Sequence, residues 1–283
     1  MGESNLWKIF SAVLARRLLK CRTQPNMSDP NTPSITEAGS PVPQSINLNE
    51  IGQRYLAALQ RTFDIAACLV AGSGAATEER YDELAKAVRF RPSAQLQRNF
   101  ENASRDTRAY LVKSVIGDAL AIVIPFMEDV RSFCTAATWN NAGTRDPEVL
   151  RKLLSTDRDA FLRMSLTSMM ETLKRDFEVF SPLAGSVFAL MKAGICIGSR
   201  GGVVSEDDVT FNGVLAFSLV TLDVSAGEES PRVAEVRHSF AVGDTVRLKD
   251  EDYLHIVSTI AMFCTSMLHS VRDAFQPKMS AAA

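Results

Sequence analysis

The chain has little histidine, and its five cysteines form no recognisable pattern. Only His238, His255 and His269 could supply imidazole ligands, which disfavours a metal site built from histidines. The cysteines are odd in number and widely separated: Cys21, Cys68, Cys134, Cys196 and Cys264. No two of them stand at the close spacing of a zinc motif, and their scatter fits a reducing compartment. We therefore expect no metal and no cofactor.

The chain also lacks an excess of charge of either sign. It has 31 basic and 33 acidic residues and a formal net charge of −2. Such a balance provides no global basicity to attract nucleic acid or an anionic membrane. The 46% of hydrophobic and 23% of charged residues are ordinary for a globular protein. Composition alone leaves the class of function open.

Motifs of the common enzyme classes are missing as well. No serine or cysteine lies in a recognisable nucleophile turn. The glycine-rich stretch 198–202 is not followed by the Lys-Ser or Lys-Thr of a phosphate-binding loop, so we expect a hairpin turn there. Each histidine is expected to be a core or surface residue rather than a catalytic base.

Charge is absent from one long stretch near the C-terminus. Between Tyr253 and Val271 there is no Asp, Glu, Lys or Arg, and three acids stand just before it. Those acids suit a helix N-terminus, with Asp250 as the cap, and apolar residues then recur at helical spacing. The opposite face is polar but uncharged, and its candidate interface residues are Ser258, Thr259, Thr265 and Ser266.

This uncharged face has two explanations. It could contact another helix, a second subunit or a ligand, because a solvated face normally carries charge. It could also belong to an ordinary core helix whose hydroxyls bond their own carbonyls. In either case we predict that the face is covered. A membrane span is disfavoured, because the run is near the minimum length and its polar groups form a full stripe. We therefore expect no transmembrane segment.

The composition predicts three parts along the chain. Residues 1–22 form a basic amphipathic segment, and 23–48 form a linker rich in Pro, Ser and Thr that is expected to be disordered. Residues 49–277 form a helix-rich globular domain. We expect a cytoplasmic protein, or a mitochondrial one if residues 1–22 act as a presequence. Met27 would be a sensible alternative initiator.

The predicted fold class is mainly α, a helical bundle with a small antiparallel β meander near the C-terminus followed by a final core helix (α+β). Pro125 is expected to kink the longest helix or to start a new one, and Asp146-Pro147 signals a helix start. The β element is expected over about 195–248, with Asn212-Gly213 as a hairpin turn. Helices are expected over 48–70, ended by the glycines of 72–74, and over 77–90, 93–139, 146–177 with an interruption at 155–159, and 181–194.

One candidate for chemistry is an acidic group on the β element. Asp223 ends one predicted strand, and Glu235 and Arg237 lie on the next. Two carboxylates beside a cation can hold Mg²⁺. With helices on either side, the arrangement resembles restriction-endonuclease-like nucleases, which implies Mg-dependent cleavage of nucleic acid. The second motif of that family normally ends in lysine, whereas Arg237 cannot serve as a base.

A second candidate is a row of arginines. If one helix continues beyond Pro92, some of these arginines share a face that could follow the phosphates of a nucleic acid. Glu101 lies on the same face, so local ion pairing explains the row equally well. The candidate residues are Arg91, Arg98, Arg105 and Arg108.

The favoured hypothesis is a non-enzymatic helical protein that self-associates as a homo-oligomer or binds a protein partner. It could be an assembly subunit that contacts nucleic acid. The alternative is the Mg-dependent nuclease-like enzyme that uses Asp223 and Glu235. A large mass on size exclusion favours the first, and loss of activity in Asp223→Ala favours the second. The most useful single measurement is the mass of the oligomer with and without nuclease treatment.

Overall fold

The structure, a computed structural model, describes residues 47–87, 100–141, 146–209, 212–223 and 232–275. The segment 1–22, nearly all of the proposed linker, Arg91 and Arg98 lie outside these residues. The helices are α2 (Leu48–Gly74), α3 (Glu78–Ala87), α4 (Phe100–Asn141), α5 (Pro147–Leu162), α6 (Leu166–Phe177), α7 (Ala184–Arg200) and α8 (Asp250–Phe275). The strands are β1 (Val214–Asp223) and β2 (Arg232–Ala241). The predicted class, mainly α with a small antiparallel sheet before a final helix, is confirmed.

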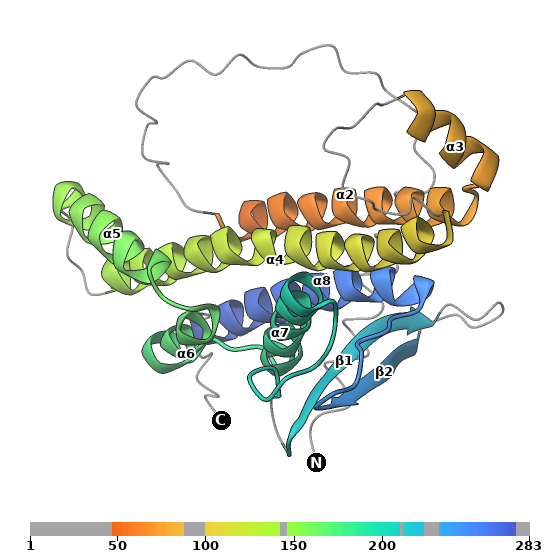
Figure 1. Ribbon diagram of the computed structural model, residues 1–283. Helices are drawn as coiled ribbons and strands as arrows, with labels where there is room; N and C mark the ends of the chain where they lie inside the picture. The colour runs from red at the N-terminus through yellow and green to blue at the C-terminus, as the bar shows by residue number, and fades with distance from the viewer. Residues whose placement is uncertain (1–46, 88–99, 142–145, 210–211, 224–231, 276–283) are drawn as a thin grey trace, which may run out of the picture.

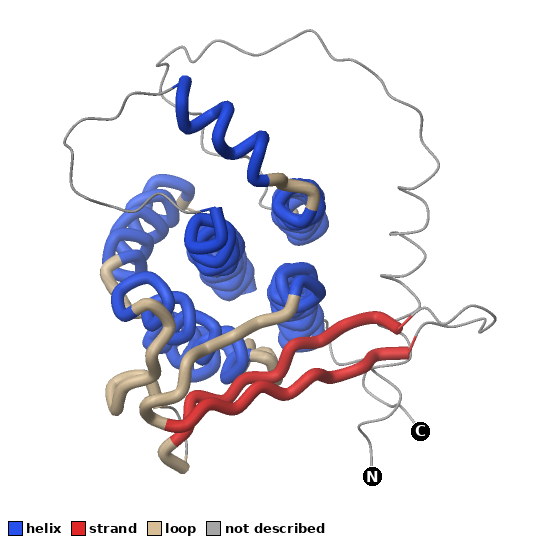
Figure 2. The backbone as a smooth tube through the Cα atoms, turned by 45° about the vertical axis from the view of Figure 1, so that its right-hand side comes forward, coloured by secondary structure: helices blue, strands red, loops and turns tan. Residues whose placement is uncertain are grey.

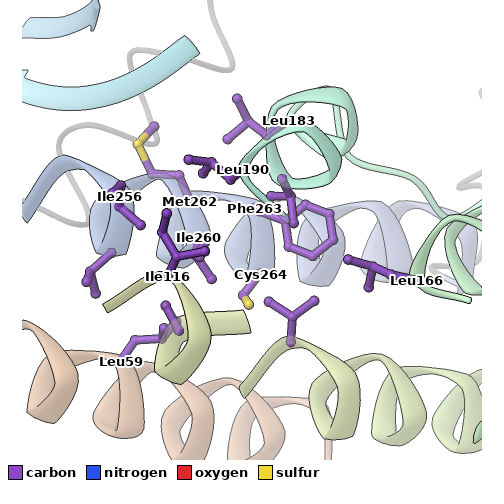
Figure 3. Close-up of a cluster of buried hydrophobic side chains, with 14 of the residues drawn as sticks. Leu59, Ile116, Leu166, Leu183, Leu190, Ile256, Ile260, Met262, Phe263 and Cys264 are labelled. Atoms are coloured by element: carbon purple, nitrogen blue, oxygen red, sulfur yellow. The ribbon is translucent and has the colours of Figure 1, made fainter. Parts of the chain in front are cut away.

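Three long helices form the centre of the fold. α2, α4 and α8 run side by side, the sheet packs against α8, and α7 packs mainly against α4 and β1 (Figure 1). The final helix is buried on more than one side, with Ile256, Ile260 and Phe263 fully enclosed. Figure 3 shows Ile116 of α4 and Leu59 of α2 on one side of α8, and Phe263 on the side that faces α7. The uncharged C-terminal stretch is therefore the core helix of the molecule.

α4 differs from the prediction at Pro125. The helix includes this proline and continues to Asn141, so no new helix starts there. Proline inside a helix removes one backbone hydrogen bond and costs about 3 kcal/mol. Val123, Phe126 and Met127 beside it are completely buried, and their packing offsets that cost.

Predicted helix caps are confirmed at the start of α5. Asp146 accepts hydrogen bonds from the backbone N–H groups of Glu148 and Val149, and Pro147 takes the first helical position. The interruption expected at 155–159 is wrong, because α5 continues to Leu162. The break comes just before α6, where the Ser165 side chain accepts from the N–H of Ser168.

The β element begins later than predicted. Residues 195–200 belong to α7, so neither the strand expected at 195–197 nor the hairpin turn at 198–202 forms. Gly194, expected to end the helix, lies inside it where α7 crosses α4; a Cβ there would stand 2.8 Å from Ile116 Cγ2. Gly201 and Gly202 end the helix at positive φ, and the N–H of Gly202 bonds the Cys196 carbonyl.

The sheet has two strands among the described residues rather than a longer meander. β1 pairs antiparallel with β2 along their whole length, from Val214 opposite Ala241 to Asp223 opposite Arg232. Both strands cross one side of the helices (Figure 2). Asn212 and Gly213 have the positive φ values of a tight turn and lie just before β1, and most of the partner strand predicted at 209–211 lies outside the described residues.

Candidate functional site

The N-terminus of α8 brings a buried carboxylate between two histidines. Asp252 is 3% exposed, and its Oδ2 accepts a hydrogen bond of 2.7 Å from the N–H of Lys249. This contact is one half of a capping box. Lys249 therefore precedes the first helical residue, and Asp250, the predicted cap, is already helical. The sequence shows the acids and the histidines, but it does not indicate that Asp252 lies between His238 and His255.

The other carboxylate oxygen of Asp252 faces the imidazoles. Its Oδ1 lies 3.3 Å from Nε2 of His238 on β2 and 3.9 Å from Nδ1 of His255 on α8. Neither nitrogen has hydrogen-bond geometry to a partner among the described residues, so each contact is an ion pair only when the ring is protonated. The His238 ring also stacks on Phe217, with 5.3 Å between ring centroids. This cluster fastens β2 to the start of α8.

An imidazole beside a carboxylate can act as an oriented base, but it needs a group to activate. Within the described residues no serine or cysteine side chain hydrogen-bonds to either imidazole ring. The same residues contain no set of three or more His, Cys, Asp or Glu side chains placed to hold a metal ion. What the described geometry shows is a contact that joins β2 to the first turn of α8.

The β ribbon separates the acids of the proposed Mg²⁺ site. Asp223 stands opposite Arg232, whereas Glu235 stands opposite Val220. Three residue steps along the ribbon, about 10 Å, separate these positions, and residues three apart alternate between the two faces. Glu235 and Arg237 share one face and are both exposed. The register does not bring the two acid positions to one point.

Only half of the arginine row lies among the described residues. Arg105 is exposed on α4, and its Nη2 donates to Asn102 Oδ1 at 2.7 Å, with Asp106 also nearby. Arg108 is exposed too, and its backbone carbonyl accepts a hydrogen bond from the hydroxyl of Tyr253. These local contacts fit a solvated helix face and leave the guanidinium groups accessible.

The hydroxyls on α8 have distinct environments. Thr259 is fully buried, donates to the His255 carbonyl and accepts from the N–H of Val220 on β1. Ser266 donates to the Phe263 carbonyl and meets the hydroxyl of Ser181, just before α7. Ser258 and Thr265 are half-buried. β1 and the start of α7 therefore cover Thr259 and Ser266 within the chain itself.

A cavity of about 280 Å³ lies between α6, α7 and α8. Its wall is mostly apolar and includes Met170, Phe188 and Met267. Lys174 lies at the same wall, with its ammonium 5.9 Å from the centre of the Phe180 ring.

The two edges of the β ribbon differ. On the outer side of β1, the N–H of Val220 donates to Thr259 Oγ1 at 2.8 Å, and that of Ser218 donates to Ser186 Oγ at 3.4 Å. Hydroxyls from α8 and α7 thus occupy the middle of this edge. Among the described residues no strand pairs with the outer side of β2.

Two helices, α4 and α8, are long and apolar enough to span a membrane by length and composition alone. Core helices of water-soluble proteins pass the same test, so this observation carries little weight. Many of their apolar residues lie in the core of the fold. Comparison with family models, with curated proteins and with solved structures finds no match to this chain.

Proposed function

We propose that this chain is a non-enzymatic, helix-rich protein that self-associates through its β ribbon. The observation that carries the proposal is the asymmetry of the two strand edges. Helix hydroxyls close the edge of β1, whereas β2 presents an unpaired edge within the described part of the chain. An open strand edge is a template for another strand, and natural proteins usually protect it.

The backbone groups on the edge of β2 follow from the register. Val220 and Ser218 direct their N–H groups away from β2, and they stand opposite Glu235 and Arg237. Opposed residues of an antiparallel pair either exchange both hydrogen bonds or none. The N–H and C=O groups of Glu235 and Arg237 must therefore point outward, where another strand can bind.

The uncharged face of α8 supports the proposal less than the strand edge does. Two of its four candidate interface residues, Thr259 and Ser266, already contact β1 and Ser181 within the same chain. Their hydroxyls are used in folding, which leaves the strand edge as the better candidate for association.

Nucleic-acid contact remains a secondary part of the proposal. The exposed Arg105 and Arg108 on α4 could bind phosphates as the protein assembles. The alternative enzymatic function would need Asp223 and Glu235 to share a metal ion, and the register separates their positions. Association without catalysis is the simpler use of the described surface.

The test is the mass of the full chain in solution. Size exclusion with light scattering should give a mass above the 31.0 kDa of one chain, and this mass should fall on dilution. Nuclease treatment before the measurement separates assembly on nucleic acid from direct self-association. A mass of one chain at every concentration tested, with and without nucleic acid, would overturn the proposal.

A further inference from the structure

We infer that β2 of one chain pairs antiparallel with β2 of a second copy, around a twofold axis at Val236. This inference rests on the proposed self-association and specifies its contact. The result would be one four-stranded antiparallel sheet in the order β1, β2, β2, β1. The occupant of the free edge is thus a strand of identical sequence.

Backbone geometry limits the pairing to a few registers. The outward N–H and C=O groups belong to odd-numbered residues, including Glu235 and Arg237. Consistent with this alternation, the N–H of Ala241 also turns away from β1 and donates to Asp244 Oδ2 at 2.8 Å. Two copies can exchange hydrogen bonds only where odd-numbered residues face odd-numbered residues, so allowed registers differ by steps of two.

The charges on β2 select one of these registers. A twofold axis at Val236 places Glu235 of each chain opposite Arg237 of the other. Opposite charges facing across strands stabilise a sheet, and like charges destabilise it. Both residues are exposed, and neither forms an ion pair among the described residues. The strand is therefore complementary in charge to a reversed copy of itself.

The neighbouring registers are disfavoured. Moving the twofold axis by one residue in one direction puts Glu235 opposite Glu235, and moving it in the other direction puts Arg237 opposite Arg237. Either arrangement places two like charges at the centre of the contact. Larger shifts leave both charges without partners and shorten the paired segment.

Val236 supports the same centre. It is 36% exposed although it is an apolar residue, and it faces Leu219 across the ribbon. On the twofold axis, the two Val236 residues would form a non-hydrogen-bonded pair, in which side chains approach most closely. Their contact would remove apolar surface from water at the middle of the interface.

The closed edge of β1 limits the assembly. Thr259 and Ser186 already bind the outward N–H groups of Val220 and Ser218, so the middle of each outer edge of the four-stranded sheet is occupied by helix hydroxyls. A contact that uses the same strand on both partners closes on itself. The geometry therefore points to a discrete dimer rather than a fibre.

The experiment uses charge exchange in the full-length chain. E235R and R237E each place like charges opposite each other and should weaken homodimers at least about tenfold. The double variant E235R/R237E restores opposite pairs and should dimerise like the wild type. An equimolar mixture of the two single variants should form heterodimers, because every Arg then faces a Glu. Light scattering and native mass spectrometry measure these masses.

A backbone variant tests the pairing independently of charge. Ser239 is exposed, and its N–H lies on the outer edge by the alternation of the strand. Proline is tolerated there in the monomer but cannot donate to an added strand. S239P should therefore weaken the dimer while S239A does not. Circular dichroism and the melting temperature confirm that each variant is folded.

The outcomes separate this inference from the function on which it rests. A wild-type chain that stays monomeric overturns both. A wild-type oligomer that is unchanged in E235R, R237E and S239P overturns the β2 pairing, while the self-association remains. Loss in both single variants with recovery in the double variant and in the mixture supports the pairing in the stated register.

Discussion

The side-chain oxygen of Thr259 on α8 accepts a hydrogen bond of 2.8 Å from the backbone N–H of Val220 on β1. The same hydroxyl donates to the carbonyl of His255, one turn earlier in its own helix. One buried side chain thus satisfies the strand and the helix together. Through this hydrogen bond, the core helix α8 binds the outer edge of β1 at a position where a third strand would otherwise pair.

Replacing Thr259 with valine should destabilise the fold. Valine keeps the shape of threonine but leaves the N–H of Val220 buried without a partner, which costs about 1 to 3 kcal/mol. The matched control is Thr259→Ser, which retains the hydroxyl and should lose less. Urea unfolding followed by circular dichroism measures both. Equal stability of the valine variant and the wild type would show that this hydrogen bond contributes nothing.

Lowering the pH should weaken the contact around Asp208. Burial tends to raise the pKa of this carboxyl, but hydrogen bonds from the N–H and hydroxyl of Ser205 and the ion pair with Arg200 hold the pKa below its usual value. The unfolded chain then binds its proton at a higher pH, near the ordinary value of about 3.9. The contribution to stability is present above that pH and is lost as the pH falls through the folded-state pKa.

Asp208→Asn should remove this dependence. Its free energy of unfolding should lie below that of the wild type at pH 7 by roughly 2 kcal/mol, because hydrogen bonds to a charged group are lost. The difference should stay constant above about pH 5 and shrink as the pH falls below the unfolded-state value of about 3.9. Urea titrations at a series of pH values measure it, and a difference that stays constant with pH would contradict the assignment.

Two glycines on neighbouring helices should respond in opposite ways to alanine. A Cβ at Gly194 would approach the β-branched Ile116 to 2.8 Å, so Gly194→Ala should cost about 1 to 3 kcal/mol. Gly117 lies inside α4 and has open space at the same position, so Gly117→Ala should stabilise the helix by about 0.5 to 1 kcal/mol. The melting temperature should fall for Gly194→Ala and rise for Gly117→Ala. A shift of the same sign in both variants would contradict the prediction.

Native-state alkylation should distinguish the cysteines. Cys68 is exposed on α2, whereas Cys134 is fully buried, and burial raises the pKa of its thiol to about 12. The thiolate is the reactive form, so iodoacetamide at pH 8 should modify Cys68 and spare Cys134. Peptide mass mapping locates the label, and repetition in denaturant shows that both thiols can react. Rapid native labelling of Cys134 would mean that this part of the core opens readily.

Predictions from the sequence were correct where the structure of a segment depends mainly on residues within that segment. Asp146-Pro147 predicted the start of α5, and the absence of charge over 253–271 predicted a covered helix. The prediction of a strand and turn over 195–202 was wrong, because apolar residues followed by glycines are equally typical of the end of a helix. Residues 195–200 continue α7 beyond Gly194, which packs closely against Ile116 of α4, and no local pattern contains that contact.

The candidate sites also show which features depend on local sequence and which depend on contacts between distant residues. Sequence identified Glu235 and Arg237 as neighbours on one strand, because alternation is a local property of strands. It could not place Asp223 relative to them, nor bring His238 to Asp252, because the hairpin register and the docking of β2 on α8 join residues distant in the chain.

The sequence by itself determined the class of the fold, most helix starts and the charge pattern of β2, since each depends on residues close together in the chain. The tertiary structure alone decided that the Thr259 hydroxyl forms its hydrogen bonds inside the fold, and that among the described residues β1 rather than β2 is bound at its outer edge. Those outcomes depend on which helices pack beside which strand. That choice is made by the burial of apolar surface over the whole domain, which no single segment encodes.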